Sequence, residues 1–300
     1  MSKKQLILLL ILFVSITSLA FYQRQVDSKR TTPTVEKFSE TSVAQTDKIQ
    51  ISKNNSPATI LQKTGSNWNI ISPITAEADQ EKINDILTRT KTLEKGDQIS
   101  DKKEKFSQFN VDEHGSHVEF FQNNKKILGF YVGKMSDDYV STFIRNDTED
   151  TVYLTKGILE SVFSQDAEAL RNKMVVQVNE ADVAEVLLKK EDKKRSFIQK
   201  NATWESTPAS ALSQNAIKEK IRTLLQIRAA SFPLKDHPTH EDMLKNFDIK
   251  VFIKRTNSDL KSTVLYIKKD SSATYGILED KQDVFTLDSS LIQTITDILS

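Results

Sequence analysis

Two of the four histidines in this chain stand at a spacing that could bind a metal ion. His237 and His240 lie three residues apart in "DHPTHED" (236–242), and acidic residues flank them. On a helix this spacing offers two ligands to a transition metal. Pro238 interrupts the pair, however, and the segment is interpreted as a polar surface loop inserted between two elements.

Three other patterns associated with catalysis are interpreted as turns or as chance matches. His114 and His117 flank Gly115, which is typical of a solvated turn. "SDKK" (100–103) has the Ser-x-x-Lys spacing of penicillin-binding enzymes, and "KTG" (63–65) is also present. In those enzymes the Ser-x-x-Lys motif precedes KTG, whereas here the order is reversed and "KTG" reads as a hairpin turn.

The remaining motif search gives no catalytic centre. The sequence contains no Gly-x-Ser-x-Gly, P-loop or Gly-x-Gly-x-x-Gly, and its carboxylate runs, "DD" (137–138) and "TED" (148–150), are typical of turns. The charged run "KKEDKKR" (189–195) is predicted to be a hairpin tip. We therefore expect no enzymatic activity and nominate no catalytic, cofactor-binding or metal-ligating residue.

Charge and cysteine content exclude further classes. The chain has 42 Lys and Arg against 41 Asp and Glu, so it lacks the basic excess on which nucleic-acid binding depends. It has no cysteine, which excludes disulfides, thiolate metal sites and thiol catalysis.

The N-terminus has the pattern of a membrane segment. Lys3 and Lys4 precede an apolar run over residues 6–22, which is near the minimum length for a spanning helix. Because basic residues stay on the cytoplasmic side, we expect residues 1–22 to be a single-pass anchor in the cytoplasmic membrane with the C-terminal part outside. A cleaved signal peptide is the alternative, since residues 18–20 form a small-x-small site.

A polar segment follows the apolar run. Residues 23–46 are rich in Thr and Ser with few large apolar groups, so they are predicted to be a flexible tether. Order is expected from about Asp47, where an alternation of apolar and polar residues begins.

The first half then has the pattern of strands around one amphipathic helix. The helix is predicted from the spacing of Ala78, Ile83, Ile86, Leu87 and Leu93. The predicted strands are 48–52, 58–63, 65–71, 116–122, 125–134, 138–145 and 150–155, and a closing helix is expected over 156–164.

The second half repeats this order. Trp204 follows Trp68 by 136 positions. The segment "AIKEKIRTLL" from Ala216 matches "ADQEKINDIL" from Ala78 at an offset of 138. Three further matches occur in the same order. They pair "QFNV" with "NFDI", "GFYVGK" with "VLYIKK", and "TVYLTKGILESVF" with "DVFTLDSSLIQTITDIL".

The series predicts an α+β fold made by internal duplication. Two tandem copies of an antiparallel-sheet-plus-helix unit are expected, over residues 47–178 and 179–300. Because the tryptophan recurs at the same joint while its neighbours diverge, we expect Trp68 to pack against the following helix rather than to bind a ligand.

The matched motifs resemble the bacterial domain-of-unknown-function family 4340. They are "NWNIISPITAEAD", "FNV", "FYVGK", "TVYLT" and "LRNKMV", and the resemblance covers most of residues 47–300. It implies a membrane-anchored protein of the kind often encoded beside ABC transporters of the gliding-motility type. The family has no established activity to carry over, and "ESTPASALSQN" (205–215) departs from its pattern.

The sequence favours two functions over a third, an envelope hydrolase that would use His237, His240 and the nearby acids. The first is a non-enzymatic, membrane-anchored extracytoplasmic accessory protein, whose ABC-transporter permease partner is implied by the resemblance alone. The second is an extracytoplasmic ligand-binding module that uses a cleft between the two copies. Neither involves nucleic acid or a cofactor.

Overall fold

The computed structural model describes residues 36–201, 203–257 and 259–299. The anchor predicted for residues 1–22 and the first part of the predicted tether lie outside these residues. Within the described part of the chain, no helix has both the length and the apolar character needed to cross a membrane. The chain forms two compact units and contains two large sheets.

Residues 36–46 are part of the folded body. Phe38 is only 2% exposed, and its ring lies 5.5 Å from the ring of Phe130 in an edge-on contact. The backbone N–H of Phe38 donates to the carbonyl of Leu93 at 2.8 Å, and that of Lys95 donates to the carbonyl of Glu36 at 2.7 Å. This differs from the flexible tether expected here, because one buried aromatic side chain fastens an otherwise polar segment.

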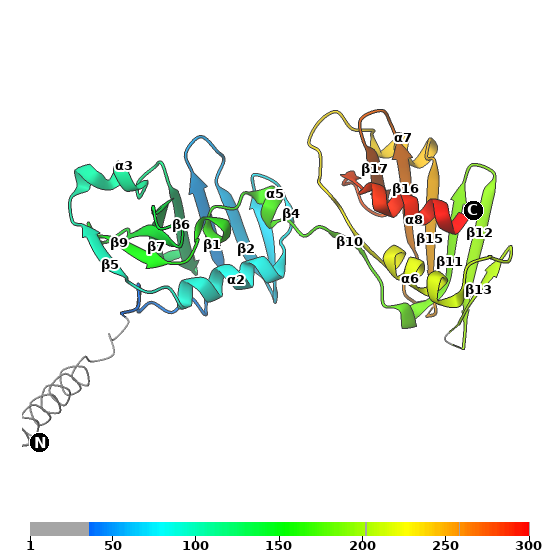
Figure 1. The fold of residues 1–300 in the computed structure, drawn as a ribbon, viewed down its shortest axis with the longest axis horizontal. Coiled ribbons are helices and arrows are strands. Elements are labelled where there is room, and N and C mark those ends of the chain that lie inside the picture. Colours follow the sequence, from blue (N-terminus) through cyan, green and yellow to red (C-terminus); the bar gives the residue numbers. More distant parts are fainter. Residues whose placement is uncertain (1–35, 202, 258, 300) are drawn as a thin grey trace, which may run out of the picture. The chain divides into compact units, whose positions relative to one another are not determined.

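The first sheet has nine strands in the order β4-β3-β2-β1-β6-β7-β8-β9-β5 (Figure 1). Its strands are β1 Lys48–Lys53, β2 Thr59–Thr64, β3 Asn67–Ser72, β4 Ala76–Glu77, β5 Asp97–Ser100, β6 Ser116–Gln122, β7 Lys125–Met135, β8 Ser141–Asn146 and β9 Val152–Lys156. The accompanying helices are α2 Gln80–Lys91, η1 Lys103–Lys105, α3 Phe106–Phe109, α4 Glu160–Phe163 and α5 Ala167–Leu170.

Apolar periodicity explains these elements. In β1 the side chains of Ile49 and Ile51 are buried while their neighbours are not, which is the two-residue period of a strand with one covered face. In α2 the buried residues Ile83 and Ile86 fall on one helical face. The closing helix expected over 156–164 is shorter than predicted, since α4 has four residues.

The second sheet has seven strands in the order β13-β12-β11-β15-β16-β17-β18. They are β11 Val183–Lys190, β12 Lys193–Lys200, β13 Thr203–Thr207, β15 Ile249–Arg255, β16 Thr263–Lys269, β17 Thr274–Leu278 and β18 Phe285–Thr286. A two-stranded ribbon pairs β10 Met174–Gln177 with β14 Gln226–Arg228. The helices are η2 Glu180–Asp182, α6 Gln214–Leu225, α7 His240–Lys245 and α8 Ser289–Leu299.

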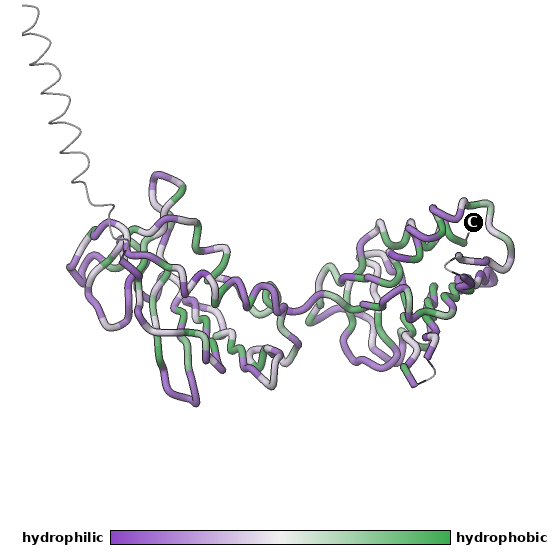
Figure 2. Tube along the Cα trace, turned by 90° about the horizontal axis from the view of Figure 1, so that it is seen from below, coloured by the Kyte–Doolittle hydropathy of each residue, from purple (hydrophilic) through white to green (hydrophobic). Residues whose placement is uncertain are grey.

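One core joins the second sheet to two of its helices. Ile217 and Ile221 of α6 and Ile295 of α8 are buried in the same cluster as the inward side chains of the strands. Val176 and Val178 also pack there, so the chain enters this fold before the start predicted at residue 179. Hydrophobic and hydrophilic residues alternate along much of the Cα trace (Figure 2).

The predicted class, mixed α+β with mostly antiparallel sheets, is confirmed. In both sheets the strands that precede the helix, β1–β4 before α2 and β11–β13 before α6, lie on one side of the strand order and the later strands lie on the other. The two long helices, α2 and α6, begin at Gln80 and Gln214, an offset of 134 (214 minus 80). The offset of 138 predicted for this segment therefore misplaces the helix by about one turn.

Candidate functional site

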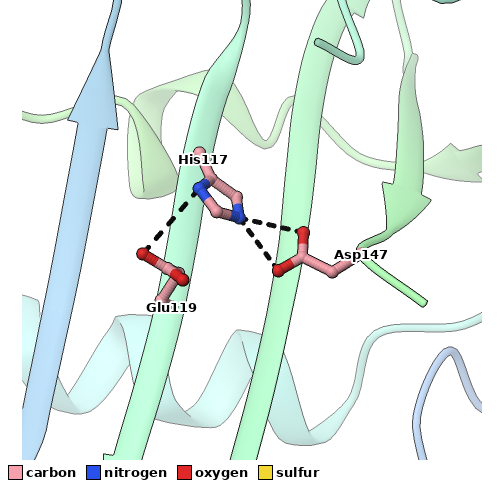
Figure 3. Close-up of side chains that lie close together, drawn as sticks. All are labelled: His117, Glu119 and Asp147. Carbon is pink, nitrogen blue, oxygen red and sulfur yellow. Dashed lines mark hydrogen bonds and ion pairs between the residues drawn. The ribbon is translucent and has the colours of Figure 1, made fainter. Parts of the chain in front are cut away.

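A cluster of ionisable side chains lies on one face of the first sheet. His117 and Glu119 are alternate residues of β6, so both leave the strand on the same side, while Val118 between them is buried. Figure 3 shows the imidazole of His117 between two carboxylates. Its Nδ1 lies 3.8 Å from Oε2 of Glu119, and its Nε2 lies 2.9 and 3.0 Å from the two oxygens of Asp147.

A glycine makes room for the carboxylate of Asp147. Asp147 follows β8, and its backbone N–H donates to the carbonyl of Gly129 in β7 at 3.0 Å. A Cβ atom at position 129 would lie only 2.1 Å from Oδ2 of Asp147. The aspartate side chain therefore occupies space that any other residue at position 129 would fill, and this brings it to the histidine.

Lys126 of β7 forms ion pairs with both Glu119 and Asp147. Its Nζ lies 3.2 Å from Oε1 of Glu119 and 3.0 Å from Oδ2 of Asp147. Burial alone would raise the pKa of the Asp147 carboxyl, but hydrogen bonds from His117 and Lys126 outweigh it and the pKa is lowered. The hydrogen bond to Asp147 and the one to Glu119 raise the pKa of the Lys126 ammonium against the opposing effect of burial.

Neighbouring side chains orient the cluster. The ring of Tyr131 stacks on the imidazole of His117, with centroids 4.3 Å apart and planes 12° apart. The buried guanidinium of Arg145 lies 4.4 Å from the centre of the Tyr131 ring. Its Nε donates to the carbonyl of Val111. Gln50 of β1 donates from Nε2 to Oε2 of Glu119 at 3.2 Å.

The arrangement has the chemistry of a cation site. Two carboxylates face one ammonium, so one negative charge is left over beside an imidazole nitrogen. Imidazole and carboxylate are ligands of Zn²⁺ and of other first-row transition metals. Among the residues that the structure describes, His117, Glu119 and Asp147 are the one group of three such side chains whose ligand atoms all lie within 4.8 Å of one another.

The sequence interpretation of the first histidine pair was half right. His114 is at a turn, half exposed, with Nδ1 2.9 Å from Oδ1 of Asp112, and this hydrogen bond raises the pKa of the imidazole. The turn prediction is wrong for His117, which lies within β6, and the strand predicted over 116–122 is confirmed. The signal was present: in an alternating strand, His-x-Glu puts both side chains on one face.

The second histidine pair is not a simple loop insertion. Thr239 caps α7 by accepting from the backbone N–H of Asp242, and His240 is the first residue of that helix. His237 lies before it, where its Nδ1 is 2.9 Å from the carbonyl oxygen of Pro238. Met243 of α7 is fully buried against β16 and β17, so the segment covers the second face of its sheet.

The turn predicted at "KTG" and the hairpin tip predicted at "KKEDKKR" are confirmed. "KTG" ends β2, with Gly65 at φ +63°, a left-handed conformation that glycine adopts without strain. "KKEDKKR" spans the tip of the β11–β12 hairpin. Ser100 of "SDKK" is buried at the end of β5 and accepts from the backbone N–H of Lys102, so its hydroxyl holds a turn.

Both tryptophans occupy structural joints. Trp68 and Trp204 are 5% and 1% exposed, and Trp204 packs in the same core cluster as Ile217 of α6. At each joint the first residue of the helix docks on the tryptophan backbone. Gln80 accepts from the N–H of Trp68 at 2.9 Å and donates to its carbonyl at 3.0 Å.

The second joint has the same two bonds. Gln214 accepts from the N–H of Trp204 at 3.1 Å and donates to its carbonyl at 2.8 Å. In addition, the indole Nε1 of Trp204 donates to Oε1 of Glu180. Each glutamine thus satisfies both backbone groups of a buried strand residue, and neither tryptophan presents a stacking surface for a ligand.

The comparisons with known proteins identify a family. A family model described as "Domain of unknown function (DUF4340)" matches residues 68–246, more than half of the chain. The chain therefore belongs to the DUF4340 family, as the sequence resemblance predicted. The match begins at the first tryptophan and includes His117, Glu119 and Asp147. No curated protein and no solved structure matches the chain.

Proposed function

We propose that this protein is a non-enzymatic, membrane-anchored accessory protein whose folded part lies on the extracytoplasmic side. The observation that carries the proposal is the apolar run over residues 6–22 behind Lys3 and Lys4. Such a run favours a single spanning helix, and the position of the lysines favours an outward-facing C-terminal part. A partner in an ABC-type transport complex is supported by family resemblance alone.

The packing of residues 36–46 sharpens this proposal. If the membrane segment ends near residue 22 and the folded body starts at Glu36, thirteen residues (23–35) link them. Even fully extended, a link of this length spans at most about 45 Å. The first sheet would then stay close to the membrane surface, within reach of an integral membrane partner.

We also infer that the two sheets descend from one duplicated unit. The inference is supported by the common strand order and by the Gln-to-Trp backbone docking at Trp68 and Trp204. A side-chain amide that makes the same two backbone bonds at the same joint is a detailed feature, and shared ancestry explains it more simply than two independent origins.

Fractionation and topology mapping test the anchor. The full-length chain is expected to stay in the membrane pellet after alkaline carbonate extraction, and a variant lacking residues 6–22 is expected to be released. Protease added to intact spheroplasts should digest the folded part, and mass spectrometry of the N-terminus separates an anchor from a cleaved signal peptide. A full-length chain in the soluble fraction, or one protected in spheroplasts, would contradict the proposal.

A second experiment addresses the partner. Affinity purification of the full-length chain from detergent-solubilised membranes should recover a permease or ATPase subunit in constant ratio. A matched variant keeps the membrane run but replaces residues 47–300 with an unrelated folded domain, and it should recover neither. Equal recovery by both variants, or recovery of no transporter subunit by the native chain, would exclude the transport role while leaving the anchor intact.

A further inference from the structure

We propose that His117, Glu119 and Asp147 form a binding site for a divalent transition-metal ion, and that Lys126 occupies it as an internal competing cation. The site lies within the first sheet and does not depend on the membrane role proposed above. Its ligands would be one imidazole nitrogen and two carboxylates, a set suited to Zn²⁺.

The position of the cation is marked by the lysine ammonium. Nζ of Lys126 lies 3.2 Å from Glu119 and 3.0 Å from Asp147, and the same aspartate oxygen, Oδ2, lies 3.0 Å from Nε2 of His117. A metal ion at this point needs bonds of about 2.0–2.2 Å. Shifts of about 1 Å by the two carboxylate groups would supply their bonds once the ammonium has left.

The lysine is free to leave, whereas the ligands are held. The side chain of Lys126 is 46% exposed, while those of Glu119 and Asp147 are each 14% exposed. Tyr131 fixes the plane of the imidazole, and Gln50 holds the glutamate through Oε2, which leaves Oε1 facing the cation. Partners of this kind, which orient ligands without binding the metal, are a regular feature of metal sites.

The imidazole must change its tautomer to become a ligand. Nε2 lies 2.9 and 3.0 Å from the two oxygens of Asp147 and donates to them, because an ionised carboxylate only accepts. Metal binding at Nε2 therefore requires the neutral ring to carry its proton on Nδ1 instead, which faces Oε2 of Glu119 at 3.8 Å.

The test is calorimetric titration of the full-length chain with ZnCl₂, supported by the visible absorption of the Co²⁺ complex. The native chain is expected to bind one ion. His117→Ala should abolish binding and the Co²⁺ band. Lys126→Met should tighten binding by roughly tenfold, since the metal no longer has to displace an ion-paired ammonium.

Lys95 provides a matched control. Its ammonium also lies between two carboxylates, Glu36 at 3.2 Å and Glu149 at 3.5 Å, and over the ring of Tyr153, but without an imidazole ligand. Lys95→Met should therefore leave the Zn²⁺ affinity unchanged. Thermal melts of each variant show whether it is folded.

Two results would overturn the proposal. One is equal Zn²⁺ binding by the native chain and a folded His117→Ala variant, which would place the ion elsewhere. The other is no binding by a folded Lys126→Met variant, in which the competing charge is absent.

Discussion

The same face of the two sheets carries different chemistry on the same backbone frame. In the first sheet His117 is paired in register with Tyr131, and in the second Lys250 is paired in register with Tyr266. The N–H of Asp147 donates to the carbonyl of Gly129, and the N–H of Glu279 donates to the carbonyl of Val264, both at 3.0 Å. This register pair and this backbone hydrogen bond thus correspond between the two sheets.

The side chains at corresponding positions diverge. Phe252 stands on the second sheet where Glu119 stands on the first, and Lys250 stands where His117 stands. In the second sheet Lys250 meets the hydroxyl of Tyr266 at 3.0 Å, and that hydroxyl donates to Oε1 of Glu279 at 2.8 Å. Where the first sheet has three possible metal ligands, the second sheet therefore has hydrogen bonds that link Lys250, Tyr266 and Glu279.

One small residue accounts for much of the difference. At Gly129 the aspartate carboxylate lies where a Cβ would be, whereas Val264 fills the corresponding volume. The carboxylate of Glu279 instead reaches the tyrosine hydroxyl. Two sheets with the same local backbone therefore carry different clusters, because the residue at position 129 or 264 decides where the neighbouring carboxylate can lie.

The largest expected effect concerns the joint between strand and helix that recurs in both sheets at Trp68 and Trp204. Trp204→Ala and Trp68→Ala should each lower the free energy of unfolding by about 3–5 kcal/mol, as for other buried aromatic residues. The loss at Trp204 should be the greater, because its indole N–H also bonds Glu180. Urea unfolding followed by circular dichroism measures both, and a loss below about 1 kcal/mol would mean that the tryptophan does not hold the joint.

The glutamines of the two joints should come next. Gln214→Ala leaves the N–H and the carbonyl of Trp204 without their side-chain partner, which costs about 1–3 kcal/mol. Gln80→Ala leaves the N–H of Trp68 and the carbonyl of Ala78 without theirs, whereas the carbonyl of Trp68 still accepts from the N–H of Ala78 at 3.1 Å, so a similar cost is expected. Gln122→Ala removes a surface amide bond to Gln45 and serves as the control, with an expected change within about 0.5 kcal/mol.

The charged cluster predicts a pH dependence for the first sheet. The folded-state pKa of Asp147 is lowered, so its contribution to stability is present above the unfolded value of about 3.9 and is lost as the pH falls through the folded pKa. Asp147→Asn should therefore destabilise the protein at pH 7 and make little difference well below pH 3.

The corresponding change in the second sheet is the control for that pH effect. Glu279→Gln keeps an oxygen that can accept from the hydroxyl of Tyr266, so its effect at pH 7 should be smaller. Urea midpoints at a series of pH values compare the two variants. An Asp147→Asn effect that is constant from pH 7 to pH 3 would contradict the ion pairing.

The smallest effect is expected from moving one ligand to the second sheet. Lys250→His places an imidazole at the position that corresponds to His117, but Phe252 offers no carboxylate, so no Zn²⁺ site should form. The double variant Lys250→His with Phe252→Glu should gain weak binding. Calorimetry measures both, and tight binding by the single variant would show that the ligand set is not what separates the two faces.

Much of the architecture could be predicted because local patterns determine it. The strand at "SHVEFFQ" follows from alternation, and the turn at Gly65 from its neighbours. The closing helix of the first half could not be predicted to its length, since apolar periodicity in "KGILESVFS" does not say how many turns the packing retains. The packing of Phe38 was missed because one aromatic in a polar segment has no periodicity.

Part of the candidate site follows from the sequence pattern, and part depends on how the strands pair. The sequence by itself determined that His117 and Glu119 share a face, because side chains on a strand repeat every two residues. Only the tertiary structure decided that Asp147, thirty residues later in the chain, joins them. Strand pairing brings it across β7, and Gly129 leaves the space that its carboxylate fills.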